Sequence, residues 1–364
     1  MREREDFKII NRNNMPSMLY SDHFLSNKRL KGDFAADEFI GKHFGESESK
    51  MALYNWLGQL DDNSALDRIP ELYTQEAFIN GAVDLPLWAD RKLMEKGSAF
   101  FIKYAGQVMQ LLGLLSLPYC YAAADGAMVL YLSQRLTNDA EKRLSDTAGF
   151  IWDVMDPDAF KREGKGFVSI LKIRLTHAVA RYYTLKSGKW KSEFGVPVNQ
   201  EDMAGTNLSF SLIVVRGLRK LGISVTYDDQ QSFLHLWNVI GSLLGLDEDL
   251  IPADGKAASA LELAIRQRHF KPSEQGRELT KSLAVYFNSV TPENVSANDT
   301  LQLMRYLLGD EVADILDLRP ASKPLYLPLI LKISSNLPDF NSGGSLKVRY
   351  QEKLKSFKKQ RSVG

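Results

Sequence analysis

The chain contains few of the side chains from which proteins build metal and redox sites. Its 364 residues include one cysteine, Cys120, and five histidines. A single cysteine excludes an intramolecular disulfide and a cysteine-rich zinc or iron–sulfur site. The motifs G-x-S-x-G, G-x-x-x-x-G-K-[ST] and H-E-x-x-H are also missing. We therefore expect any metal to enter within a cofactor that brings most of its own ligands.

The net charge is close to zero, and the amino-acid composition is ordinary. The 46 Lys and Arg residues nearly cancel the 45 Asp and Glu residues, so no overall field favours nucleic acid as a partner. Apolar residues make up 44% of the chain and charged residues 25%, with only 25 glycines and 13 prolines. This composition is typical of a globular protein with a sizeable core.

No membrane or export signal is evident. The opening segment, MREREDFKII, is charged and lacks the apolar stretch and small-residue cleavage site of a signal peptide. The most apolar run, residues 108–124, contains Gln110 and is interrupted by Pro118. It is shorter than the roughly 20 apolar residues that a membrane helix needs. We therefore expect no transmembrane segment and a cytoplasmic location.

Helical patterns dominate the sequence. Asn138 and Asn199 carry start signals, and Gly188, Gly222 and Gly245 follow as stop signals. Alternating strand patterns and internal repeats are nearly absent, which predicts an all-α protein. Apolar residues recur every three to four positions in ten segments, namely 47–60, 86–96, 99–117, 121–135, 138–152, 167–186, 199–221, 228–244, 257–270 and 273–288.

The distribution of these patterns predicts one large helical domain with two extensions. Residues 1–45 are expected to form an irregular or partly helical N-terminal extension, and residues 46–340 the domain. Residues 341–364 are expected to form a flexible basic tail that begins at the joint NSGGS. A solvated terminus is the favoured interpretation of this tail, and weak contact with an anionic membrane is the alternative. Its basic residues are Lys347, Arg349, Lys353, Lys355, Lys358, Lys359 and Arg361.

The helix predicted over 167–186 carries an unusual polar stripe. Apolar residues lie nearly all round it, which indicates a central, buried helix. Arg174, His177 and Arg181 nevertheless share one face, with an arginine one turn on either side of the histidine. Because a buried guanidinium is costly without an anion, a negatively charged group is expected against this face.

Two interpretations of the stripe remain open. The cationic neighbours disfavour a charged His177, and a neutral imidazole can donate a lone pair to a metal. Iron porphyrin meets both requirements, since the iron takes an axial histidine and its two carboxylates need cations. Alternatively, His177 is an ordinary core histidine, and Arg174 and Arg181 pair with carboxylates of neighbouring helices.

A second polar group lies on the helix predicted over 138–152. Arg143 and Thr147 are four residues apart and point the same way, with Asp146 beside them. An arginine and a hydroxyl on an adjacent helix could line the far side of a cofactor pocket, where oxygen binds. The alternative is a surface arginine beside a helical threonine.

Taken together, these stretches resemble the MpaB/rubber oxygenase catalytic domain, a family that includes the latex clearing proteins. The resemblance runs over roughly residues 80–250. Its most specific element is the order and spacing of R-x-x-H-x-x-x-R after R-x-x-x-T. The stretches that carry it are 117–126, 143–147, 174–181, 195–206, 218–222 and 237–245.

The resemblance implies a globin-like helical core that holds haem b, and oxidative cleavage of isoprenoid C=C bonds with O2. His177 would be the axial iron ligand, and Arg174 and Arg181 would be the flanking arginines of the cofactor site. Arg143 and Thr147 would be the family's second motif pair.

Two departures from the family pattern bear on the substrate. Latex clearing proteins can carry a lysine just before the motif threonine, where this chain has Asp146. The glutamate that they use as a base has no match near Ala127. The nearest carboxylate, Asp125, is the candidate base here, and Asp146 is a second candidate catalytic carboxylate beside Arg143 and Thr147. We therefore expect a smaller unsaturated, isoprenoid-like molecule in place of the polymer. The alternatives are a haem-binding or peroxidase-like protein without oxygenase turnover, and a helical interaction protein without haem.

Overall fold

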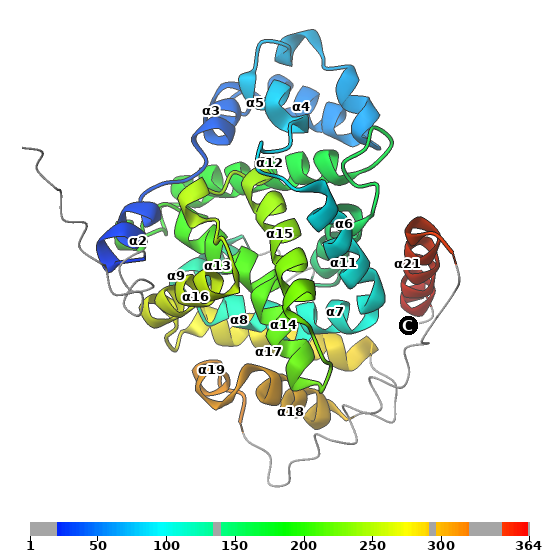
Figure 1. The fold of residues 1–364 in the computed structure, drawn as a ribbon. Helices are drawn as coiled ribbons and strands as arrows, with labels where there is room; N and C mark the ends of the chain where they lie inside the picture. Colours follow the sequence, from blue (N-terminus) through cyan, green and yellow to red (C-terminus); the bar gives the residue numbers. More distant parts are fainter. Residues whose placement is uncertain (1–19, 134–139, 291–295, 320–343, 363–364) are drawn as a thin grey trace, which may run out of the picture.

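A computed structural model describes residues 20–133, 140–290, 296–319 and 344–362. Within these ranges the chain is built from helices and contains no strand, as the sequence predicts (Figure 1). An isolated bridge between Ala123 and Phe270 is the only β-type pairing among the described residues.

The described helices fall into three groups by their place relative to the candidate site described below. Those before the site are α2 (Asp22–Arg29), α3 (Phe34–His43), α4 (Ser47–Gln59), α5 (Ala77–Asn80), α6 (Arg91–Lys103) and α7 (Ala105–Leu111). Those that build it are α8 (Leu117–Tyr121), α9 (Ala124–Leu132), α11 (Ala140–Met155), α12 (Gly166–Lys186), α13 (Gln200–Phe210), α15 (Tyr227–Leu243) and α16 (Gly255–His269). The others are α14 (Leu212–Lys220), α17 (Glu274–Val290), α18 (Ala297–Leu308), α19 (Asp310–Ile315) and α21 (Leu346–Ser362).

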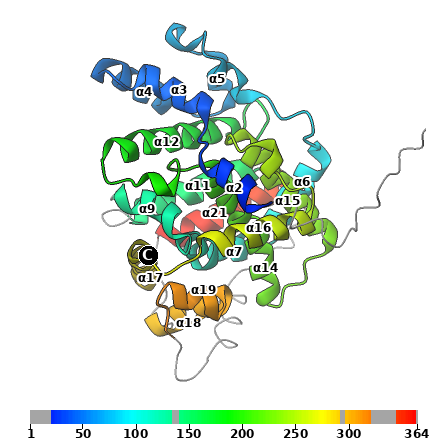
Figure 2. The same cartoon turned by 90° about the vertical axis from the view of Figure 1, so that its left-hand side faces the viewer.

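The helix α12 occupies the place that its sequence predicts. It lies between the group α3, α4 and α5 on one side and α9 and α11 on the other (Figures 1 and 2). Its apolar residues, such as Val168, Leu171 and Leu175, pack with Phe39 and Trp56 in one hydrophobic cluster. Burial on both sides explains why this helix is apolar nearly all round.

Two predicted helices are broken in the structure. The segment predicted over 99–117 bends at Tyr104, where α6 and α7 meet at 84°, and then passes through a π-helical turn at Leu112–Ser116. The segment predicted over 199–221 breaks at Ser211, whose hydroxyl donates a hydrogen bond of 2.7 Å to the Asn207 carbonyl. Such a bond back to the preceding turn competes with the helix and favours a bend.

The described part of the C-terminal segment is helical, where the sequence predicts a flexible basic tail. Residues 346–362 form α21, which lies beside α6 and α7 (Figure 1). Tyr350 is buried and donates a hydrogen bond of 2.7 Å to the Trp152 carbonyl, while Lys347 pairs with Asp156 at 2.6 Å. These anchors outweigh the basic character of the segment. The first three residues of the NSGGS joint lie outside the described residues.

The N-terminal extension also contains regular structure. Helices α2 and α3 lie within residues 20–45 and pack on α13 and α12. The helix ends agree with the predicted signals, because Asn199 caps α13 and Gly188, Gly222 and Gly245 all have positive φ. Asn138 lies outside the described residues.

No single helix in the described part of the chain is long and apolar enough to cross a membrane. The bent pair Arg91–Lys103 and Ala105–Tyr121 would reach that length only when taken together.

Candidate functional site

A cavity of about 570 Å³ lies at the centre of the helical body. Helices α8, α9, α11, α12, α13, α15 and α16 contribute to its wall, so segments from residue 117 to residue 270 meet there. Cavities of a few hundred to a thousand Å³ with mostly apolar walls are typical of small-molecule and cofactor sites. The apolar wall residues include Leu117, Leu130, Ile173, Phe210, Ile265 and Phe270.

His177 lies on this wall, in the middle of α12. Its Nδ1 atom is buried and has no hydrogen-bond partner among the described residues. Burial lowers the pKa of His177 to about 4, and the charges of Arg181 and Arg143 act in the same direction while Asp33 opposes them. The imidazole is therefore neutral at physiological pH and can offer a lone pair to a metal.

The two flanking arginines point away from the cavity wall and into the N-terminal extension. Arg174 donates two hydrogen bonds to the Asp33 carboxylate, one of 2.9 Å from Nη2, and its guanidinium lies 4.8 Å from the Phe78 ring. Arg181 donates to Asp37 at 2.5 Å. The sequence had left open whether these arginines pair with neighbouring carboxylates, and the structure shows that they do.

One nitrogen of the Arg181 guanidinium, Nη2, is buried and left without a hydrogen-bond partner among the described residues. The side chain of Arg181 is 2% exposed, and its Nη1 donates to the Val198 carbonyl at 3.1 Å. A cofactor contact by Arg181 or Arg174 stays a prediction.

The second motif pair reaches the same cavity. Arg143, Asp146 and Thr147 all lie on its wall, together with Lys142 from the same helix, α11. The Thr147 hydroxyl donates a hydrogen bond of 2.9 Å to the Arg143 carbonyl, so its proton is directed into the helix. The structure thus brings Arg143 and Thr147 to the same cavity as His177, which lies about 30 residues later in the sequence.

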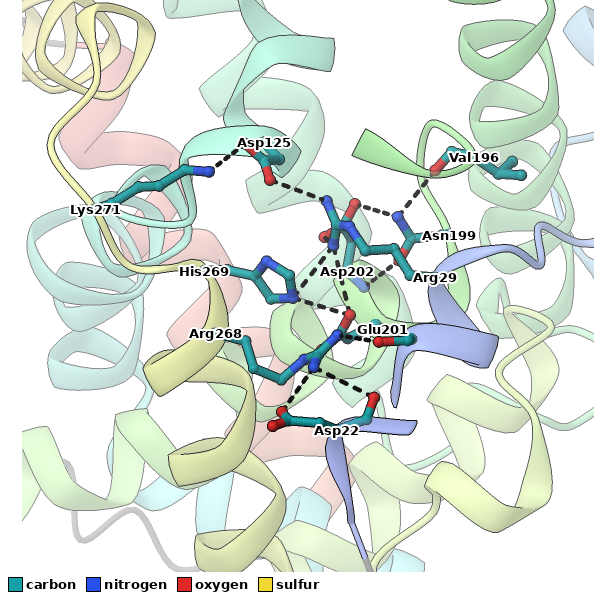
Figure 3. A network of polar contacts seen from close by, with 11 residues as sticks. Asp22, Arg29, Asp125, Val196, Asn199, Glu201, Asp202, Arg268, His269 and Lys271 are labelled. Atoms are coloured by element: carbon teal, nitrogen blue, oxygen red, sulfur yellow. Dashed lines mark hydrogen bonds and ion pairs between the residues drawn. The ribbon is translucent and has the colours of Figure 1, made fainter. Parts of the chain in front are cut away.

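Asp125 is placed differently. It is buried but is not among the residues that line the cavity. Its carboxylate pairs with Lys271 at 3.0 Å and lies 3.8 Å from the Arg29 guanidinium (Figure 3). These contacts give it a part in an ion network behind the wall, and its role as a base stays a prediction.

Two wall carboxylates had no distinctive signal in the sequence. Asp202 is typical of a first-turn acidic residue of α13, yet it is one of the residues that line the cavity, and its carboxylate pairs with Arg29 at 3.0 Å. Glu262 accepts hydrogen bonds from the Tyr119 hydroxyl and from Arg216, and its proximity raises the pKa of Tyr119, which burial raises most. Sequence spacing could not find either site, because the partners lie 46 to 173 residues away.

Comparison with known proteins settles the family. The family model described as "ER-bound oxygenase mpaB/B'/Rubber oxygenase, catalytic domain" matches residues 93–329. The chain belongs to this family. The match covers the whole cavity wall from α8 to α16.

Individual members of the mpaB/rubber oxygenase family are also similar. The chain is 29% identical over 273 residues to the rubber oxygenase of Streptomyces sp. (strain K30). The aligned region covers 73% of this chain and 65% of that protein's length. A solved structure of latex clearing protein in the closed state has a TM-score of 0.73 and 24% identity, covering 91% of this chain and 90% of that one. The resemblance inferred from the motifs is therefore confirmed, and so is the helical fold.

The residues of this family member fit an iron porphyrin. A neutral imidazole with an unpartnered nitrogen lies on a cavity of suitable size. Lys142 and Arg143 on the same wall supply positive charge that carboxylates could meet. The mostly apolar wall suits the flat face of a macrocycle, and His177 is the histidine that lines the cavity in the described part of the chain.

Proposed function

We propose that the protein is a haem b-dependent oxygenase that acts with O2 on an unsaturated, isoprenoid-like apolar substrate. The observation that carries the proposal is the neutral, partly unpartnered His177 on the wall of the central cavity. The mpaB/rubber oxygenase family supports the oxygenase class. The 65% coverage of the Streptomyces protein is the reason why activity and substrate are proposed for this chain.

The haem would contribute an iron centre that binds and activates O2, and the chain's own residues would hold the reactants. His177 would bind the iron through its imidazole. Arg143 and Lys142 would neutralise porphyrin carboxylates. Arg174 would act mainly through Asp33, by fixing α12 and with it the ring of His177.

The apolar wall would bind the substrate and exclude water. Leu130, Phe150 and Phe210 are among the residues that could contact a hydrocarbon chain. Thr147 directs its proton to the backbone, and Asp146 is exposed where the family can carry a lysine.

The first test is an absorption spectrum of the purified full chain, with and without added hemin. Wild-type protein should show a Soret band near ~400 nm, and His177→Ala should lose it or shift it. His23→Ala is the matched control, because His23 is exposed on α2 and contacts only Asn27 among the described side chains. A colourless wild type that takes up no hemin would contradict the proposal and favour a helical interaction protein.

The second test is O2 uptake by the haem-loaded protein with a C15 isoprenoid alkene, followed with an oxygen electrode. Uptake with a cleaved or oxygenated product supports the oxygenase. A normal haem spectrum without uptake on isoprenoids of several lengths would favour a haem-binding or peroxidase-like protein. Fractionation of source cells tests the proposed cytoplasmic location, and sedimentation with anionic vesicles tests weak membrane contact by α21.

A further inference from the structure

A segment that precedes the region matched by the family model packs against α13, one of the helices of the cavity wall. Residues 28–37, which we call the N-terminal strap, join α2 to α3 and run along the start of α13. The backbone N–H groups of Val196 and Gln200 donate to the carbonyls of Arg29 at 3.0 Å and Lys31 at 2.9 Å. The Gln200 side chain also donates to the Gly32 carbonyl at 3.0 Å. The strap therefore pairs with the helix that carries Asp202.

Two glycines show how closely the strap is packed. A Cβ at Gly195 would lie 2.5 Å from the Arg29 carbonyl oxygen, and a Cβ at Gly245 would lie 2.5 Å from Asp33 Oδ2. Both glycines also have positive φ, at 76° and 89°. Any other residue at either position would push the strap away from α13.

Arg29 reaches from the strap to the cavity wall. Its side chain is buried, and its Nη1 donates to Asp202 Oδ1 at 3.0 Å (Figure 3). The other oxygen, Asp202 Oδ2, accepts a hydrogen bond of 2.8 Å from Asn199 Nδ2. Both oxygens of this wall carboxylate are therefore fixed, one by the strap and one by the helix cap.

The wall itself leaves room beside the carboxylate. Asp202 lines the cavity together with Gly126, and a Cβ at Gly126 would already lie 3.3 Å from Asp202 Cγ and Oδ1. Glycine at this position keeps α9 close to the carboxylate without covering it. Asp202 is thus an acidic residue on the wall that a molecule in the cavity can meet.

The charge of Asp202 depends on its neighbours from four elements. Burial raises the pKa of Asp202 above its usual range; Arg29 and His269 oppose that rise, and Glu201 adds to it. Further groups complete the surroundings: Asp125 from α9 lies 3.8 Å from Arg29, Lys271 pairs with Asp125, and Arg268 pairs with Glu201 (Figure 3). Arg29 is the cation in direct contact with Asp202, so its removal would favour the protonated carboxyl group.

We propose that Arg29 is a positioning residue of the site, which acts from the N-terminal strap to orient the cavity-wall carboxylate of Asp202 and to favour its charged form. Asp202 then contacts the occupant of the cavity. Through the strap, the N-terminal extension contributes to binding in the cavity. This inference rests on the proposed function only in naming that occupant as haem and substrate.

The test is a set of variants of the full chain: Arg29→Met, Asp202→Asn and the double variant. Two probes report on the cavity, hemin by absorption and the neutral fluorophore N-phenylnaphthylamine in haem-free protein. Arg29→Met leaves the Asp202 carboxylate without its cation, and Asp202→Asn leaves Arg29 only its longer ion-pair contacts, with Glu201 at 3.6 Å and Asp125 at 3.8 Å. Each single variant should therefore weaken binding on the order of tenfold. The double variant removes both charges and should bind more tightly than either single one.

The matched control is Arg305→Met. Arg305 is likewise buried, and it donates at 2.6 Å both to Asp314 and to the Leu318 carbonyl, away from the cavity. It should lower thermal stability without changing the affinity for either probe. If Arg29→Met behaves in the same way, Arg29 has only a structural role and the proposal is overturned.

A pH profile separates positioning from packing. Relative to wild type, Arg29→Met should shift the pH dependence of probe affinity to higher pH, because burial already raises the pKa of Asp202 and the pKa rises further without the cation. The double variant, which has no carboxyl group at position 202, should lack this pH dependence. A profile of Arg29→Met that is unchanged from wild type would overturn the proposal.

The two probes distinguish failure of this inference from failure of the proposed function. A wild type that binds no hemin contradicts the haem proposal, yet the strap proposal stands if the fluorophore shows the expected order of affinities. Should a single variant fail to fold, recovery of folded protein in the double variant supports the coupling. Failure of the double variant to fold would overturn it.

Discussion

Arg174 donates both of its hydrogen bonds to Asp33, a residue 141 positions away that also caps α3. The arginine lies one turn before His177 on α12, so the contact ties the helix of the histidine to the N-terminal extension. The sequence pattern around His177 suggested that Arg174 contacts a cofactor, whereas in the structure Arg174 forms an ion pair with Asp33. The predictions below follow from this and similar contacts.

The Asp33–Arg174 pair can be weakened without losing the helix cap. Asparagine caps a helix as well as aspartate does, so Asp33→Asn removes the charge and leaves the cap to the Ala36 N–H. We expect the free energy of unfolding to fall by about 1–2 kcal/mol, because a charged hydrogen bond is lost at a site where Asp33 is buried. Urea denaturation measures the change.

Asp254→Asn is the control for that substitution. Asp254 caps α16 by accepting from the Ala257 N–H at 2.8 Å and forms no ion pair with the described residues. Its variant should stay within about 0.5 kcal/mol of wild type. Equal effects of the two substitutions would show that the Arg174 contact adds no stability.

The pKa of His177 predicts a pH-dependent stability of the haem-free protein. The folded-state pKa of about 4 lies below the ordinary value of 6.5, so the unfolded chain binds more protons in between. The contribution of His177 to stability is complete above about pH 6.5 and is lost as the pH falls through about 4. Urea denaturation at several pH values should show this slope in wild type and a flatter one in His177→Asn. Identical profiles would contradict the burial of a neutral imidazole.

Two helical glycines should respond in opposite directions to alanine. A Cβ at Gly97 would lie 2.6 Å from the Ser232 carbonyl oxygen, where α6 packs on α15. Gly97→Ala should therefore destabilise by about 1–3 kcal/mol. Gly149 on α11 has no atom within 4 Å of such a Cβ, so Gly149→Ala should stabilise by up to about 1 kcal/mol. Thermal unfolding of both variants tests the α6–α15 contact directly.

The docking of α21 can be tested at Tyr350. Its ring is buried against Trp152, with centroids 5.5 Å apart, so Tyr350→Ala should cost about 3 kcal/mol of unfolding free energy. Tyr227→Ala is the control, because Tyr227 is 67% exposed on α15 and should change stability by less than about 0.5 kcal/mol. An effect of Tyr350→Ala no larger than that of the control would show that this ring does not anchor α21, as expected for the flexible tail that the sequence predicts.

The sequence predicted which residues form the site better than it predicted which side chains contact them. The spacing of Arg143, Thr147 and His177 placed these residues on helical faces, and the structure brings those faces to one cavity. The roles proposed for Asp125 and Asp146 rested on nearness in the sequence, and Asp125 lies behind the wall in an ion network. Local spacing reports direction around a helix axis and carries no information on which distant element approaches that face.

The sequence by itself determined the helical class, the central place of α12 and the family. These depend on apolar periodicity, on cap residues such as Asn199 and on motif order, all of which are local. Only the tertiary structure decided that Asp33 and Asp37 bind the two arginines, that Arg29 supports Asp202, and that residues 346–362 dock. The physical reason is that a charge or an apolar face chooses its partner by proximity in the folded molecule, across separations of 141 to 198 residues that no local pattern records.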